Sequence, residues 1–188
     1  MKKISIIALI VLTLTLIASC GTAGTGNNAD VSYTDATEVI TKVWNTFGED
    51  EKFPVGGGDS ANLVMDTAGK FDVANTEELD VTLALPASQH ANIEEAASMM
   101  HMMNANQLTV GAYKLKADVD MTAFADDYKS GLDSRRWMCG FPEKYVVISS
   151  GNYVMTAFGN AMNIDLLKTK ALEALDSATV VSEGNIEA

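Results

Sequence analysis

The sequence predicts an α+β fold, a small and mainly antiparallel sheet with a C-terminal β-hairpin and helices packed on one face. Segments 144–150 and 153–158 are rich in β-branched and aromatic residues, and they flank Gly151-Asn152. Because this pair supplies the positive φ angles of a tight turn, we expect a hairpin there. Elsewhere, apolar residues recur at three- and four-residue steps, as they do in amphipathic helices. The two patterns together indicate the mixed fold class.

The helical pattern first appears between residues 34 and 48. Thr34 is a suitable N-cap, acidic residues follow it, and apolar residues then recur until Gly48 ends the pattern. A second helix is predicted over residues 92–103, because one face of it would carry Ile93, Ala96, Ala97, Met100 and Met103.

The pattern then alternates along residues 108–116, which predicts a strand. A third helix follows, capped by Asp120 or Thr122 and continuing to Leu132. A fourth is expected over residues 161–175. The last dozen residues have the composition of a frayed tail, in which Val180 and Val181 would add a short edge strand.

Two segments before residue 92 are harder to assign. Gly56, Gly57 and Gly58 lack the lysine, hydroxyl residue and following helix of a phosphate-binding loop, so we interpret them as a mobile loop. Residues 76–83 form a short helix capped by Thr76, or residues 81–85 form a strand. Periodicity does not decide between these alternatives over so few residues.

The N-terminal residues predict export. Lys2 and Lys3 precede an apolar run too short to span a bilayer, and the run ends in Ile17-Ala18-Ser19-Cys20. This ending resembles a bacterial lipobox, which implies that Cys20 receives a diacylglyceryl group and becomes the new N-terminus. An ordinary secretory signal and a short uncleaved anchor are the alternatives. We therefore expect a lipoprotein signal peptide (1–19), a flexible tether (20–33) and one α+β domain (34–188).

The chain is strongly acidic. It carries 25 acidic and 13 basic residues, and removal of residues 1–19 would lower its net charge from −12 to −14. Such a surface repels phosphate backbones, which argues against nucleic acid as a partner. If the lipobox is used, Cys139 has no cysteine partner in the mature chain, so no disulfide framework is expected. With two histidines and no Gly-x-Ser-x-Gly motif, the chain lacks the residues for a catalytic triad of this type and for a histidine-rich zinc site.

Two segments could still carry a site. In Met99-Met100-His101-Met102-Met103, thioether and imidazole groups suit Cu(I), and on a helix Met99, Met102 and Met103 would gather on one side. Methionine also fills irregular cores, which is the simpler interpretation. The second segment is Trp137–Pro142, where Trp137, Cys139, Phe141 and Pro142 would form an apolar recess or would plug the core. Cys139 lacks the second cysteine of a Cys-x-x-Cys pair, so dithiol exchange within one chain is excluded.

Several of these segments resemble a family of clostridial envelope lipoproteins that share a domain of unknown function. The resemblance rests on the lipobox, on residues 96–105 (AASMMHMMNA), on Trp137–Glu143 (WMCGFPE) and on residues 153–159 (YVMTAFG). It covers about residues 91–175. Some relatives are labelled bacteriocin transport accessory proteins, which implies a thioredoxin-like activity that needs paired cysteines absent here.

We therefore expect a non-enzymatic binding or accessory protein without a cofactor. Its acyl anchor at Cys20 would hold it on the extracytoplasmic face of a bacterial cell membrane, and the resemblance implies a Gram-positive host. Its partner would be a protein or a small ligand. The alternatives are a Cu(I)-handling lipoprotein that uses the methionine segment and, third, a single-cysteine thiol enzyme.

Overall fold

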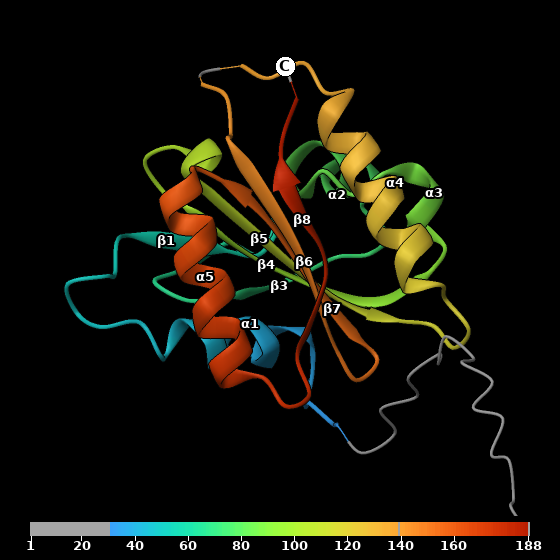
Figure 1. Ribbon diagram of the computed structural model, residues 1–188, viewed down its shortest axis with the longest axis horizontal. Coiled ribbons are helices and arrows are strands. Elements are labelled where there is room, and N and C mark those ends of the chain that lie inside the picture. Colours follow the sequence, from blue (N-terminus) through green and yellow to red (C-terminus); the bar gives the residue numbers. More distant parts are fainter. Residues whose placement is uncertain (1–30, 139, 188) are drawn as a thin grey trace, which may run out of the picture.

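The fold is an antiparallel sheet of eight strands with helices packed against it, which confirms the predicted α+β class (Figure 1). The computed structural model of the chain describes residues 31–138 and 140–187. The strands are β1 (Val55–Gly57), β2 (Val64–Met65), β3 (Gly69–Phe71), β4 (Ile93–His101), β5 (Leu108–Leu115), β6 (Lys144–Ser150), β7 (Tyr153–Gly159) and β8 (Thr179–Asn185). Their order is β2-β1-β4-β5-β7-β6-β8, and β3 also pairs with β4.

The helices cover both faces of the sheet, so the expectation of one covered face is wrong. They are α1 (Ala36–Trp44), α2 (Thr76–Leu83), α3 (Ala87–His90), α4 (Met121–Asp133) and α5 (Ala161–Ala174), with a 3₁₀ turn η1 (Ala105–Gln107). One hydrophobic core lies between the sheet and α1 with α5. The other lies between the sheet and α2 with α4. The sheet is therefore the middle layer of three.

Several elements agree with the sequence prediction. The β6–β7 hairpin turns at Gly151-Asn152, with Gly151 at φ 61°. Strand β5 and helices α4 and α5 end within one or two residues of their expected bounds. Asp120 caps α4, because its carboxylate accepts hydrogen bonds from the first turn. Helix α2 decides the open choice at residues 76–85 in favour of a helix, although Asn75 and not Thr76 caps it. The expected edge strand at Val180 and Val181 is present as β8, but it extends over Thr179–Asn185, so the expectation of a frayed tail is wrong.

The predicted helix over residues 92–103 is wrong, since Ile93–His101 form β4. The strand is covered on both faces: Ala96 belongs to one core, whereas Ala97 and Met99 belong to the other. A strand buried on both sides shows no polar alternation, and its apolar run then resembles a helix. A register shift between Ile93 and Glu95 further interrupts the two-residue alternation along the strand.

The glycine run begins in the sheet and is not a mobile loop, since Gly56 and Gly57 belong to β1 and Gly58 follows directly. Strands β1 and β3 share one edge of β4, where β1 pairs with residues 100–101 and β3 with residues 96–98. At their junction the backbones of Gly57 and Gly69 meet beside Ser98. A Cβ atom on Gly57 would lie 2.3 Å from the Gly69 nitrogen and 2.6 Å from the Ser98 carbonyl oxygen. Glycine is required there because any side chain would separate the two strands.

The loop that follows β1 is held by a buried carboxylate. Asp59 accepts hydrogen bonds from the backbone of Ala61, Asn62 and Asp72, at 3.0, 2.9 and 2.8 Å. Burial raises the pKa of Asp59, but these hydrogen bonds outweigh it and hold the pKa below its ordinary value. Asp59 therefore stays ionised at neutral pH and joins the two ends of the β1–β3 segment.

The domain begins earlier than residue 34. Tyr33, which the sequence analysis assigns to the tether, is buried in the core with α1. Its hydroxyl group is 2.5 Å from the Ser150 hydroxyl group, at the end of β6. Asp35, and not Thr34, caps α1. The signal peptide, Cys20 and the tether up to residue 30 lie outside the described residues.

We predict that Gly57→Ala destabilises the fold, because the new methyl group would overlap the Gly69 and Ser98 backbones. The expected loss is about 2–3 kcal/mol in the free energy of unfolding, measured by urea denaturation. The matched control is Gly131→Ala in α4, where the nearest atom would be 3.6 Å away. That change should stabilise the helix by up to about 1 kcal/mol. Equal effects of the two substitutions would contradict the packing argument.

Candidate functional site

Three connections meet at one end of the sheet, and amide side chains join them. They are residues 102–107, which include η1, residues 134–143 between α4 and β6, and Asn160 between β7 and α5. The Asn106 amide nitrogen donates to the carbonyl oxygens of Met138 and Gly140, both at 2.9 Å. The connections lie at the top of the molecule in Figure 1.

The same turn is tied to the start of α5. The Asn163 amide nitrogen donates to the Gln107 carbonyl oxygen at 3.0 Å, and Asn160 bonds the Gln107 side chain. On the far side, the Glu143 carboxylate accepts from the Ala161 backbone nitrogen at 2.7 Å, as an additional cap on α5. The three connections therefore form one hydrogen-bonded unit instead of three independent loops.

Trp137 anchors the 134–143 connection. Its half-buried ring lies 5.1 Å from the Phe158 ring, 6.4 Å from the Phe141 ring and 5.5 Å from the Arg135 guanidinium group. Arg135 also donates to the carbonyl oxygens at the end of α2, which fixes the cation beside the ring. The tryptophan thus packs on the sheet, whereas the next residue, Met138, is exposed.

Besides Met102, whose side chain turns back over Gly56, four large apolar side chains are exposed on these connections and in the first turn of α5, and we call these four the distal surface. They are Met103 (83% exposed), Met138 (75%), Phe141 (42%) and Met162 (75%). Methionine is flexible and polarisable, and it is common on surfaces that adapt to a binding partner. Contiguous exposed apolar patches are typical of interaction sites, and these four residues belong to segments at one end of the sheet.

Only part of the predicted recess belongs to this surface. Phe141 is exposed, whereas Trp137 packs against the core and Pro142 is buried. Cys139 lies outside the described residues, so its role stays a prediction. The sequence analysis missed Met138 and Met162 as surface residues. Met138 stands inside the segment already singled out, but nothing in the sequence shows that Trp137 turns inward and Met138 outward.

The predicted methionine set does not come together. Met99 is fully buried among the core residues under α1, whereas Met102 and Met103 are exposed after the end of β4. The His101 ring stacks on Phe53 at 4.7 Å, and its Nδ1 atom accepts from the Met103 backbone nitrogen. The helical face that would have joined Met99, Met102 and Met103 does not exist.

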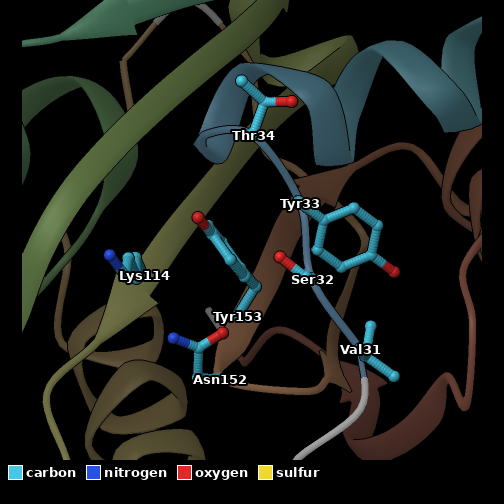
Figure 2. Close-up of a pocket in the computed structure, with 7 residues that line it drawn as sticks. All are labelled: Val31, Ser32, Tyr33, Thr34, Lys114, Asn152 and Tyr153. Carbon is cyan, nitrogen blue, oxygen red and sulfur yellow. The ribbon is translucent and has the colours of Figure 1, made fainter.

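A cleft of about 490 Å³ lies at the opposite end of the sheet, where the described chain begins (Figure 2). Residues 31–34 form one wall, and Lys114 of β5 with Asn152 and Tyr153 of the hairpin form the other. The Lys114 ammonium group lies 3.4 and 3.3 Å from the Glu94 and Glu95 carboxylates. Hydrogen bonding to Glu95 and Glu94 raises the pKa of Lys114. Its charge is thus already matched, and the cleft offers no free cation to an anionic ligand.

Two tyrosines buried under α4 are equally unsuited to acid–base work. Burial raises the pKa of both Tyr113 and Tyr128 above the ordinary phenol range, although the nearby Thr156 hydroxyl group opposes the shift. Both phenols therefore stay protonated at neutral pH. No cluster of three His, Cys, Asp or Glu side chains with metal-binding geometry occurs among residues 31–138 and 140–187.

The chain is thus a three-layer α+β domain with exposed apolar side chains at one end of the sheet. The comparisons with known proteins found no match: no family model fits the sequence, and no curated protein or solved structure is detectably similar. In the part of the chain that the structure describes, no helix is both long and apolar enough to cross a membrane.

We predict that Trp137→Ala leaves the protein folded but destabilised, because the ring covers Phe158 yet is only partly buried. The expected loss is about 2–3 kcal/mol in the free energy of unfolding, below the range for a fully buried tryptophan. Met138→Ala is the control, since its side chain is 75% exposed and should change stability by less than about 0.5 kcal/mol. Urea denaturation followed by far-UV circular dichroism measures both. A loss at Met138 as large as at Trp137 would contradict this description of the loop.

Proposed function

We propose that this chain is a lipid-anchored binding or accessory protein of a bacterial cell envelope, and that its distal surface docks a partner protein without catalysis. The observation that carries the proposal is the exposure of Met103, Met138, Phe141 and Met162 on connections and a helix start at one end of the sheet. Exposed apolar side chains are removed from water, which is favourable, only when another surface covers them.

The position of this surface relative to the anchor supports the proposal. Val31 contacts the β6–β7 turn, since its Cβ atom lies 3.0 Å from the position that a Cβ atom on Gly151 would occupy. From that turn, β7 leads over seven residues to Gly159, where the distal connections begin. At about 3.3 Å per residue this is about 20 Å. An anchor joined through Val31 would thus leave the distal surface facing away from the membrane.

The charge of the chain indicates the kind of partner. The net charge is −12 over the full sequence, so an acidic partner would be repelled over the whole approach. We therefore expect a protein whose contact region presents apolar side chains with basic residues around them. The resemblance to clostridial envelope lipoproteins agrees with a surface location in a Gram-positive host, and it supplies no mechanism.

The anchor itself is tested at Cys20. We predict that the chain fractionates with membranes and carries the mass of a diacylglyceryl group, whereas Cys20→Ala releases it or leaves an uncleaved precursor. Intact-mass spectrometry on the membrane and medium fractions distinguishes these states. Cys139→Ser is the matched control and should remain acylated. Membrane-bound, cleaved protein without acyl mass would exclude the lipoprotein assignment.

The docking surface is tested by site-specific photo-crosslinking in intact cells. We predict that a photoreactive residue at Phe141 yields one discrete adduct with another protein, and that Met103→Glu with Met138→Glu abolishes it. The two glutamates would place negative charge in the apolar contact. Because both side chains are exposed, the substitutions leave the two hydrophobic cores unchanged. A photoreactive residue at Leu172, which is 44% exposed on α5, is the matched control and should give no adduct.

Three outcomes would contradict this proposal. The first is the absence of an adduct at Phe141 while the anchored protein is folded and abundant. The second is the same adducts from Leu172, which would indicate random collisions. The third is an adduct of twice the chain mass, which would show that the surface joins two copies of this chain and not a different protein.

A further inference from the structure

The strand register brings together methionines that are far apart in the sequence. Gly56 of β1 pairs with Met65 of β2 on one side and with Met100 of β4 on the other. Residues directly opposite in antiparallel strands have their side chains on the same face, about 5 Å apart at their Cα atoms. The Met65 and Met100 side chains therefore flank Gly56 on one face of the sheet.

A third methionine lies directly over the same glycine. The Met102 sulfur would be 2.6 Å from a Cβ atom on Gly56, so it occupies the space that any other residue there would fill. Its backbone nitrogen donates to the Pro54 carbonyl oxygen at 3.0 Å, which fixes the turn that returns the side chain over β1. A methionine side chain is long enough for the sulfurs of Met65 and Met100 to reach Met102 from either side.

From this geometry we propose that Met65, Met100 and Met102 form a thioether site for Cu(I) above Gly56. Thioether sulfur is a soft, neutral ligand that selects Cu(I) over harder divalent ions. The site is open to solvent, since Met65 is 55% and Met102 is 41% exposed. The acidic surface of the chain raises the local concentration of cations. This inference does not rest on the docking function.

The neighbouring candidates for ligands lie elsewhere. Met99 and His101 point to the opposite face, where Met99 is buried under α1 and His101 stacks on Phe53. Met103 follows Met102 directly but is 83% exposed on the distal connection. Leu63 supplies an apolar neighbour, because its Cδ1 atom would be 3.3 Å from the same Cβ position on Gly56. The site is thus three thioethers with an apolar wall.

Competition with a chromophoric Cu(I) chelator under anaerobic conditions tests the site. The acylated protein in detergent is used with Cys139→Ser, because a free thiolate would bind Cu(I) by itself. We expect uptake of one Cu(I) per chain. Met65→Leu and Met102→Leu should each weaken the affinity at least tenfold, and the double variant should abolish stoichiometric uptake. Leucine preserves volume, so circular dichroism should show unchanged folding.

Met103→Leu is the matched control, since it removes a thioether one residue away from Met102. Its affinity should equal that of the parent protein. The pH dependence gives a second readout, because thioethers need not lose a proton to bind a metal, whereas thiols and imidazoles do. Affinity should stay constant between about pH 8 and pH 5. Absent uptake, equal loss in Met103→Leu, or uptake unchanged in the Met65→Leu, Met102→Leu double variant would overturn the proposal.

Discussion

Burial of the central strands on both faces is the constraint on which the rest of the structure depends. Strand β7 is buried at all seven positions, and β4, β5 and β6 are buried at most of theirs. A sheet in this state needs a layer of helices on each side, because each face presents apolar side chains. The chain meets this need with α1 and α5 on one face and α2 and α4 on the other. What remains free for function is the set of connections at the strand ends.

This constraint also explains which elements could be predicted. The hairpin was predictable because its turn pair and its β-branched residues signal it locally. Helix α4 was predictable because one face of it is exposed, so Phe124, Tyr128 and Leu132 form a clear stripe. Strand β4 was not, because alanine and methionine favour helices and two-sided burial removes alternation. The helices on both faces were missed for the same reason, because a sheet with β4 buried on both sides needs a helical layer on each.

The candidate sites were less predictable than the fold, for a different reason. Both depend on which residues the tertiary structure places side by side. Met65 belongs to β2 and Met102 to the connection after β4, and only the strand register around Gly56 brings them together. The run Met99–Met103 suggested a site because its residues are adjacent in sequence, yet alternation along a strand separates them. The glycine run was interpreted as flexible, although its lack of side chains is what allows β1, β3 and Met102 to approach.

The two proposed sites meet at consecutive residues. Met102 turns back over β1, whereas Met103 extends from the distal connection, so a metal at the first would restrain the backbone that positions the second. If that restraint changes the affinity of the distal surface for its partner, thermodynamic linkage requires the partner to change the affinity for copper by the same factor. The sign depends on whether the restrained backbone presents Met103 as the partner needs it. Any such coupling would pass through a single peptide unit, because Met102 and Met103 are consecutive residues.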